Sequence, residues 1–327
     1  MKRNRVIGVD LGGTTTKFGL YNDQAKLLHQ WAIPTDTTSN GSHILKNMCD
    51  SIKQTLKENE LTVDSLLGVG IGAPGVVDNE NGTVCNAFNL GWSDKQDVKT
   101  TFNEQGLTIP LYLTNDANCA AYGEGNISND ESVVFITLGT GVGGGVIIDN
   151  KILQGNVNSA GEIGHMRSYL NYGFTCTCGN DNCLESVASA TGIVNVAKKE
   201  SEDFNESSQL NKMIKENKDI TAKTVFDLAK QDDKLANKVV DLITYDIGVS
   251  CGNIANLLNP KSIIIGGGVS HAGTMLLDKI VSVFNTVAFP LVKTSTKIKL
   301  ATLGNDAGIT GAAYMVIKGE TKHDETI

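Results

Sequence analysis

The feature that most constrains the fold of this chain is a sequence pattern that occurs twice. The stretch IGVDLGGTTTKFGL, residues 7–20, and the stretch VFITLGTGVGGGVI, residues 134–147, each contain an apolar run, a turn rich in glycine and threonine, and a second apolar run. Two apolar runs separated by a short glycine-containing turn are typical of a β-hairpin. The repetition therefore predicts an internal duplication, with two similar α/β halves around a cleft, which is a common place for ligands.

Length and composition agree with two domains and exclude several classes of protein. The chain has 327 residues, and domains usually contain about 100–200 residues. Its net charge of −8 argues against nucleic acid as a partner. The longest apolar runs are shorter than the roughly 20 residues of a membrane span, and the first of them is too short for a signal peptide. Seven cysteines, an odd number, favour a reducing, cytoplasmic setting over a disulfide scaffold.

Hydrophobic periodicity predicts the main elements of an α/β fold. Strands are expected at residues 6–10, 18–21, 67–71, 111–114, 133–137 and 262–265, and helices at 41–60, directly after residue 116, and at 306–317. The polar stretch 201–238 is expected to form solvated surface helices. The last helix is rich in small residues and is expected to pack closely on a sheet.

Three glycine-rich turns are candidates for binding a nucleotide. Glycine lets backbone N–H groups approach phosphate oxygens, and hydroxyl groups add further donors, although a tight hairpin without a ligand gives the same pattern. The candidate residues are Gly12, Gly13, Thr14, Thr15 and Lys17 in the first turn, Gly139, Thr140 and Gly141 in the second, and Gly267 and Gly268 in the third. The third turn suits adenine or ribose. Asp10, at the end of the first strand, is a candidate for holding Mg²⁺ directly or through water.

Asp116 begins a predicted helix directly after a strand, in the run Asn115-Asp116-Ala117-Asn118. An Asp or Asn at such a junction can simply cap the helix. In phosphoryl transfer, the same carboxylate would act as a general base that accepts a hydroxyl proton, a role that contributes about 10²–10⁴-fold to the rate. Asn115 would then bind a neighbouring hydroxyl. The residues alone leave both interpretations open.

A cluster of cysteines follows the run Glu162-Ile163-Gly164-His165. Three thiolates, from Cys176, Cys178 and Cys183, and the imidazole of His165 are the ligands of a closed tetrahedral zinc site with a structural role. Three reduced cysteines in a loop are the alternative. A metal at this place would hold neighbouring polar residues in position and would do no chemistry itself.

Ten motifs along the chain resemble those of the ROK family (repressor, open reading frame, kinase), and within it the ATP-dependent glucokinases of Gram-positive bacteria. They cover residues 6 to about 316 in the order DLGGTTTKFGL, GIGAPGVVD, AFNLGW, NDANCAAYGE, TLGTGVGGG, AGEIGH, CTCGNDNCLES, SATG, IIIGGGVS and DAGITGAA. The resemblance implies an actin-like ATPase (ribonuclease H-like) fold. Its smaller α/β domain would comprise residues 1–117 and about 304–327, and its larger α/β domain residues 118–303 with the zinc site.

The resemblance also implies an activity, the transfer of the γ-phosphoryl group of ATP to the 6-hydroxyl of glucose, and a homodimer. Asp116 would be the catalytic base, and the two glycine-threonine turns would hold the ATP phosphates with Mg²⁺. The implied sugar contacts are Asn89, Asn115, Glu162, His165 and Glu185, and the implied zinc ligands are His165, Cys176, Cys178 and Cys183.

Two positions depart from the family pattern, because asparagine stands where glycine is usual. Asn182 precedes the last cysteine of the cluster, and Asn158 precedes AGEIGH. Asparagine tolerates left-handed backbone conformations, so the turn at Asn182 is expected to survive. Asn158 is expected to bear on the entrance to the sugar site.

Three other functions stay open at this point. The sugar could be N-acetylmannosamine, fructose or allose instead of glucose. A sugar-responsive repressor would need a helix-turn-helix module ahead of the first strand, which is expected to begin at about residue 5. A general actin-like ATPase would hydrolyse ATP at a rate that sugars do not change.

Overall fold

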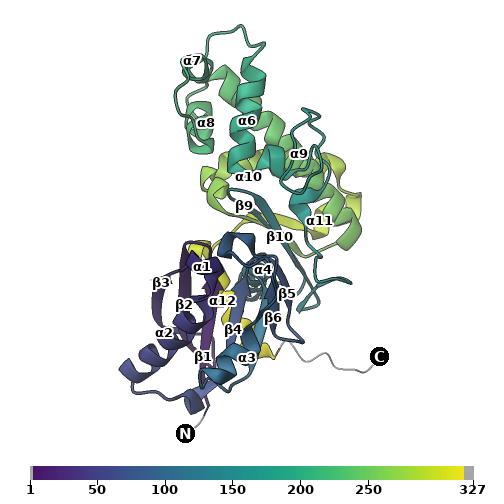
Figure 1. Ribbon diagram of the computed structural model, residues 1–327. Coiled ribbons are helices and arrows are strands. Elements are labelled where there is room, and N and C mark those ends of the chain that lie inside the picture. The colour runs from purple at the N-terminus through teal and green to yellow at the C-terminus, as the bar shows by residue number, and fades with distance from the viewer. Residues whose placement is uncertain (1–2, 320–327) are drawn as a thin grey trace. The chain divides into compact units, whose positions relative to one another are not determined.

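A computed structural model describes residues 3–319, which form two compact units. The first unit comprises residues 3–131, 145–160 and 305–319, and the second comprises residues 132–144 and 161–304. Each unit contains a sheet with helices packed against it (Figure 1). The predicted α/β class is confirmed by these two sheets.

The first unit begins with a hairpin and ends with the last helix of the chain. Its elements are β1 (Arg5–Leu11), β2 (Thr15–Asn22), β3 (Leu27–Pro34), α1 (Thr38–Gly41), α2 (Ile44–Glu58), β4 (Leu66–Ala73), β5 (Val76–Asp78), β6 (Thr83–Cys85), β7 (Gln96–Asp97), α3 (Val98–Glu104), β8 (Leu111–Asn115), α4 (Asp116–Ser128), β11 (Lys151–Ile152) and α12 (Ala307–Lys318). The expected strands and the expected last helix are all present. The second strand is longer than predicted, because β2 already begins at Thr15, a residue of the first glycine-threonine turn.

The main sheet of the first unit has the strand order β3-β2-β1-β4-β8. Strand β1 pairs antiparallel with β2, whereas β1, β4 and β8 run parallel to one another. The carboxyl ends of parallel strands meet at one edge of a sheet, and in open α/β sheets this edge is the usual ligand-binding edge. Here it carries Asp10, near the end of β1, and Asn115, at the end of β8.

Helix α12 packs closely on this sheet, as its small residues predicted. It contacts β1, β4 and α4. A Cβ atom added to Gly70 of β4 would overlap the carbonyl oxygen of Ala312, and one added to Gly311 would overlap the carbonyl oxygen of Cys119 on α4. Glycine at these two positions lets the backbone of α12 touch the backbones of β4 and α4.

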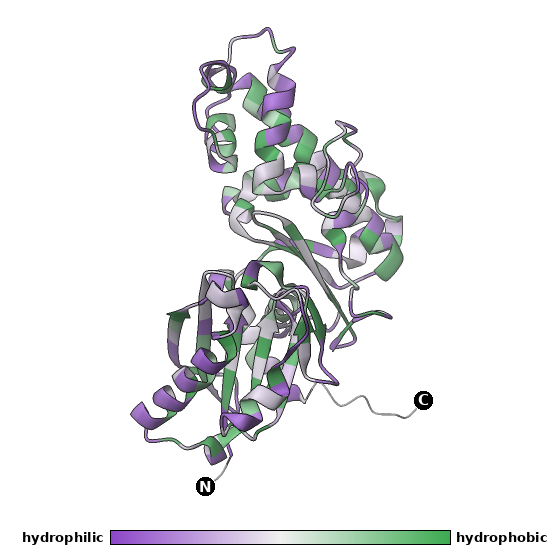
Figure 2. Cartoon of the chain, viewed as in Figure 1, coloured by the Kyte–Doolittle hydropathy of each residue, from purple (hydrophilic) through white to green (hydrophobic). Residues whose placement is uncertain are grey.

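Helix α2 is amphipathic and packs its apolar face into the core of the first unit. Its buried side chains include Ile44, Met48, Ile52 and Leu56, at the spacing that predicted the helix. Hydrophilic colours run along much of the rest of α2 in Figure 2, while hydrophobic colours follow the strands beneath it. The helix begins at Ile44 and not at residue 41, because Gly41 has a left-handed φ of 66°.

The second unit contains the second hairpin and most of the helices. Its elements are β9 (Val133–Leu138), α5 (Glu185–Ala188), α6 (Ala190–Ser201), α7 (Gln209–Lys215), α8 (Ala222–Ala229), α9 (Lys234–Leu258), β12 (Ser262–Gly266), α10 (Thr274–Val287), α11 (Pro290–Ser295) and β13 (Lys297–Leu300). Strand β10 (Val142–Ile148) starts in this unit. The sheet order is β11-β10-β9-β12-β13, with β9, β12 and β13 parallel.

The polar stretch 201–238 is more than a set of solvated surface helices. Helices α7 and α8 each bury an apolar side, which includes Leu210 on α7 and Val225 and Phe226 on α8. Both helices contact α9. The expected surface helices are therefore present, and each also has a buried apolar side that packs on the rest of the unit.

The predicted domain boundaries stay a prediction. Among the described residues, α4 belongs to the first unit because it packs along α12 in that unit. In the described part of the chain, none of the helices combines the length and the apolar character needed to cross a membrane.

Candidate active site and metal centre

The first glycine-threonine turn presents two hydroxyl groups to solvent. Thr14 and Thr15 are exposed, and the N–H of Gly12 donates to the carbonyl of Thr15 at 3.2 Å. The hydroxyl of Thr35 donates to the carbonyl of Gly12 at 2.7 Å and lies 2.9 Å from the hydroxyl of the buried Thr16. Thr16 and Thr35 therefore hold the turn through hydrogen bonds and leave the exposed hydroxyls of Thr14 and Thr15 available to a ligand. The sequence did not reveal this role of Thr16 and Thr35.

The carboxyl group of Asp10 is largely desolvated, and desolvation opposes its ionisation. Burial raises the pKa of its carboxyl group to about 6, against the lowering effect of Lys17, and the nearby carboxylate of Asp116 raises it further. Lys17 is the residue opposite Asp10 in the β1–β2 register, and its Nζ donates to the carbonyl of Asn305 at 3.1 Å. A desolvated carboxylate next to a second one is typical of a site that binds a cation.

Asp116 is the first residue of α4 and follows the N-cap residue Asn115. The Asn115 side chain accepts the N–H of Ala117 at 2.9 Å, and Oδ1 of Asp116 lies 2.8 Å from the same N–H. The Asp116 side chain is accessible to solvent, yet desolvation by the dense protein around it raises the pKa of the carboxyl group above its ordinary value of 3.8. Asn115 thus already caps the helix, so capping alone does not explain an acid at position 116.

Asn89 lies beside the first glycine-threonine turn. A Cβ atom added to Gly13 would be 3.3 Å from Nδ2 of Asn89. The segment that carries Asn89 is held by the buried Leu90 and Trp92, and the indole N–H of Trp92 donates to the carbonyl of Gly41 at 3.2 Å. Within the first unit, Asp10 therefore lies near Asp116, and Asn89 lies against Gly13, three residues after Asp10.

In the second unit, two glycine-rich turns lie at the same edge of the sheet. Strands β9 and β12 are parallel neighbours, so the turn after Leu138 and the turn after Gly266 follow adjacent strand ends. A Cβ atom added to Gly267, whose φ is 81°, would overlap the backbone of Leu138. Thr140 is exposed, and the N–H of Gly139 donates to the carbonyl of Gly141 at 2.9 Å. The second and third candidate turns are therefore neighbours.

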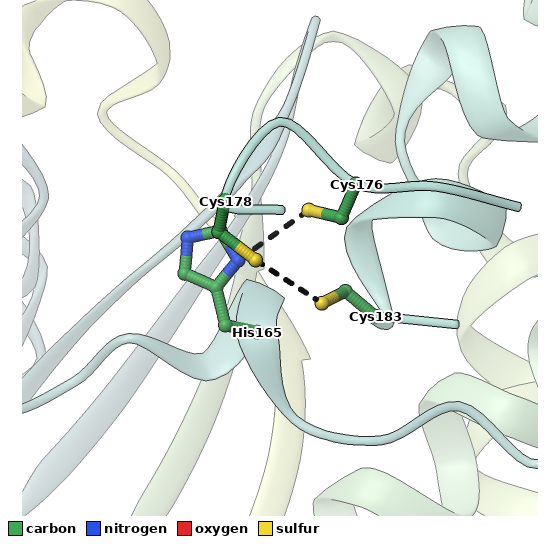
Figure 3. A group of neighbouring side chains, drawn as sticks. All are labelled: His165, Cys176, Cys178 and Cys183. Atoms are coloured by element: carbon green, nitrogen blue, oxygen red, sulfur yellow. Dashed lines mark hydrogen bonds between the residues drawn. The ribbon is translucent and has the colours of Figure 1, made fainter. Parts of the chain in front are cut away.

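The four predicted metal ligands form one cluster in the second unit. The side chains of His165, Cys176, Cys178 and Cys183 point toward one another (Figure 3), and their ligand atoms all lie within 4.8 Å of each other. Nδ1 of His165 is 3.6 Å from Sγ of Cys176, and Sγ of Cys178 is 3.6 Å from Sγ of Cys183. Zinc bonds of ~2.3 Å to sulfur and ~2.0 Å to nitrogen place tetrahedral ligands roughly 3.6–3.8 Å apart. The residues therefore fit a zinc ion.

The chemistry of the thiols agrees with this fit. The backbone N–H of Asn180 contributes most to holding the pKa of Cys178 at about 7, whereas burial raises the pKa of Cys183 to about 12. A coordinated metal deprotonates its thiol ligands outright, so it would supply the positive charge that a buried thiolate needs.

Two residues hold the loop that carries the cysteines: Asn182, which the sequence analysis discussed, and Asp246, which it did not. Asn182 has a left-handed φ of 57°, and its side chain accepts the N–H of Gly173 at 2.8 Å, so the predicted survival of this turn is confirmed. Asn158 also has a φ of 57°. Asp246, which the sequence analysis missed, is buried on α9 and accepts the N–H of Tyr169 at 2.9 Å and the hydroxyl of Ser168. In the sequence it is one of two acids, with Asp241, in the apolar run 239–249, so nothing singled it out.

The remaining candidate residues border the metal cluster. Oε2 of Glu162 lies 3.7 Å from Nε2 of His165. The imidazole thus turns Nδ1 to the cysteines and Nε2 toward a carboxylate. Glu185 is the first residue of α5, and its Oε1 accepts the hydroxyl of Thr177 at 3.2 Å. The second unit therefore gathers Glu162, His165 and Glu185 around the metal cluster.

Comparison with known proteins assigns the chain to a family. The ROK family pattern matches residues 6–319. The glucokinase of Halalkalibacterium halodurans is 39% identical over 98% of this chain and 97% of its own length. The xylose repressor of Caldicellulosiruptor bescii is 31% identical over 95% of this chain and 78% of its own length. A crystal structure of a ROK family glucokinase from Streptomyces griseus, in complex with glucose and AMPPNP, is 30% identical, with a TM-score of 0.72 over 95% of this chain and 98% of that one.

The relatives that this chain matches thus include glucokinases and a xylose repressor. The chain belongs to the ROK family. The predicted actin-like ATPase fold is confirmed by the likeness to the solved structures of a putative sugar kinase and of the ROK family glucokinase.

Asp10→Asn is expected to stabilise the protein at about pH 8, by up to about 3 kcal/mol for a pKa that rises from 3.8 to about 6. Between these two values the folded state binds more protons than the unfolded state, so the contribution of Asp10 to stability falls as the pH rises. The advantage of the variant should disappear near pH 4. Urea unfolding at both pH values measures this difference, and a variant without a stability gain at the higher pH would contradict the unfavourable burial of the charge.

Proposed function

We propose that the protein is a glucokinase, which transfers the γ-phosphoryl group of ATP to the 6-hydroxyl of glucose and yields glucose 6-phosphate and ADP. The observation that carries this proposal is the 39% identity to a glucokinase across nearly the full length of both chains. Support also comes from Asp116, an accessible carboxylate of raised pKa directly behind a helix cap.

In the proposed mechanism, Asp116 orients the attacking hydroxyl and accepts its proton as the bond to phosphorus forms. A raised pKa brings the carboxylate closer to the working pH and makes it a better proton acceptor than an ordinary aspartate. The proposed sugar contacts are Asn89 and Asn115 in the first unit and Glu162, His165 and Glu185 in the second. Amide, carboxylate and imidazole groups of this kind suit the many hydroxyls of a pyranose.

The ATP phosphates are assigned to the two glycine-threonine turns. Thr14 and Thr15 offer exposed hydroxyls in the first turn, and Thr140 offers one in the second. Gly267 and Gly268, beside the second turn, are assigned to the nucleoside. Mg²⁺, when bound, neutralises phosphate charge, and Asp10 would hold it directly or through water.

A structural zinc ion is assigned to His165, Cys176, Cys178 and Cys183. Four protein ligands leave no open position, so the ion would brace the residues around it and take no part in the chemical step. The proposal is supported by the spacing of the four ligand atoms.

A coupled assay of ADP release across a panel of hexoses tests the proposed function. Glucose should give the highest kcat/KM. A higher value for N-acetylmannosamine, fructose or allose would assign another sugar to the same kinase, and ATP turnover that no sugar changes would refute the kinase proposal.

A sugar-binding regulator is the second candidate, since a xylose repressor is 31% identical to the chain. This function predicts a mobility shift of operator DNA at moderate salt and no ADP release with any hexose. The kinase proposal predicts the opposite outcome in both experiments.

The homodimer remains a prediction, and a group of exposed apolar side chains supports it. Leu257, Phe289 and Leu291 are 82%, 58% and 73% exposed, and the N–H of Phe289 donates to Oδ1 of Asn256 next to Leu257. Leu291→Asp is expected to shift the protein from dimer to monomer, because a charge placed in an apolar interface stays unpaired. Light scattering after gel filtration measures the mass. Leu28→Asp, at another exposed leucine, is the control, and a Leu291→Asp protein of unchanged mass would contradict this interface.

A further inference from the structure

The carboxylate of Glu185 joins two parts of the second unit that have different expected ligands. Its Oε2 accepts the backbone N–H of Val142 at 3.0 Å, directly after Gly141 of the second glycine-threonine turn. Its Oε1 accepts the hydroxyl of Thr177 at 3.2 Å and lies 3.6 Å from Sγ of Cys176. One side chain therefore connects the metal cluster with the turn assigned to the ATP phosphates.

Two further contacts hold the same turn against the metal centre. A Cβ atom added to Gly164, next to the metal-site residue His165, would overlap the carbonyl oxygen of Val142. The N–H of Ala190, at the start of α6, donates to the carbonyl of Gly139 at 2.8 Å. The turn is thus held by residues 163–165 and by residues 185–190. The first segment ends at the metal-site residue His165, and the second begins two residues after Cys183.

The glycine at position 141 is required by this arrangement. A Cβ atom there would overlap Oε2 of Glu185. The turn therefore has room for the carboxylate only because residue 141 has no side chain. Conversely, the carboxylate fixes the direction of the Val142 N–H.

We propose that Glu185 is a positioning residue through which metal occupancy is coupled to nucleotide binding. The proposal rests on the proposed function in one respect, that the second glycine-threonine turn binds ATP phosphates. With the metal bound, Cys176 and its neighbour Thr177 are fixed, so Glu185 is held from its Oε1 side and orders the turn from its Oε2 side. Without the metal, the cysteine loop loosens and the turn is less ordered. Nucleotide binding must then order the turn, which lowers the affinity for the nucleotide.

The coupling must act in both directions. If zinc raises the affinity for the nucleotide by some factor, the nucleotide raises the affinity for zinc by the same factor. A residue that merely stabilises the fold would lower both affinities without linking them. The linkage, and not the affinity itself, is therefore the property to measure.

Titration calorimetry with AMPPNP and Mg²⁺, in the absence of sugar, measures the coupling in zinc-loaded and zinc-depleted protein. We expect the depleted wild type to bind AMPPNP on the order of tenfold more weakly. Chelator competition on the loaded protein should show zinc held more tightly, by the same factor, when AMPPNP is present. This second measurement decides the matter if the depleted protein does not stay folded.

Glu185→Ala should bind AMPPNP equally with and without zinc, because the link is lost. Glu206→Ala is the matched control, since Glu206 is an exposed glutamate of the same unit that pairs with Lys234, and it should keep the full zinc dependence. Equal AMPPNP affinity in the two wild-type forms, or an unchanged zinc dependence in Glu185→Ala, would overturn the proposal. Failure of the proposed function has a different signature, in which the coupling is present but hexoses yield no ADP.

Discussion

Replacing Asp116 with asparagine is expected to lower kcat by about 10²–10⁴-fold while the Kd for glucose changes only a few-fold. Asparagine has the same shape, and its Oδ1 can still accept the N–H of Ala117, which Asp116 contacts at 2.8 Å. It cannot accept a proton from the sugar hydroxyl. Steady-state kinetics, together with glucose binding by calorimetry, separates the lost proton transfer from lost binding.

The pH dependence of the reaction gives the same prediction a second readout. Desolvation raises the pKa of Asp116 above 3.8, and only the ionised form can act as base. The kcat/KM of the wild type should therefore fall as the pH is lowered through this raised pKa. In Asp116→Asn the residual activity should not show this decline.

Asp97→Asn is the matched control, because Asp97 caps α3 in the same unit and accepts the N–H of Thr100 at 2.8 Å. Asparagine is as good a helix cap as aspartate, so this variant should keep its kcat. If Asp116 only supported the start of α4, both variants would behave alike, and an unchanged kcat in Asp116→Asn would remove the base from the proposed mechanism.

The repeated hairpin was predictable because its signal is local. Apolar runs on both sides of a glycine-threonine turn predicted strands, and the structure has β1 and β2 at the first copy and β9 and β10 at the second. Helix α9 was not predicted, although it is 25 residues long. Its buried face contains Asp246, Ser250 and Gly252 among apolar residues, so hydrophobic periodicity alone gives a weak signal.

The composition of the candidate site was predictable, but its internal contacts were not. The four metal ligands were visible as a rare grouping of cysteines after a histidine, and the structure places them in one cluster. The contact between Gly13 and Asn89 and the hydrogen bond from Val142 to Glu185 join segments far apart in the sequence. Such contacts depend on how sheets and helices pack, which no local pattern encodes.

Gly311→Ala is expected to destabilise the protein by about 3 kcal/mol, because overpacking against rigid backbone cannot be relieved by side-chain rotation. The added Cβ atom would overlap the carbonyl oxygen of Cys119 and lie 2.9 Å from the backbone nitrogen of Gly123. Both atoms belong to the backbone of α4, so α4 and α12 must move apart. Urea unfolding measures the loss of stability.

The sign of this change separates packing from intrinsic helix propensity. Propensity alone predicts that alanine in the middle of α12 stabilises the helix by about 0.8–1.0 kcal/mol. Gly268→Ala is the matched control, since no described atom lies within 4 Å of the added Cβ, and it should leave stability nearly unchanged. A stabilised Gly311→Ala protein would show that α4 and α12 are free to separate. Because Asp116 begins α4, the expected destabilisation should bring a loss of kcat with it, through displacement of the proposed base.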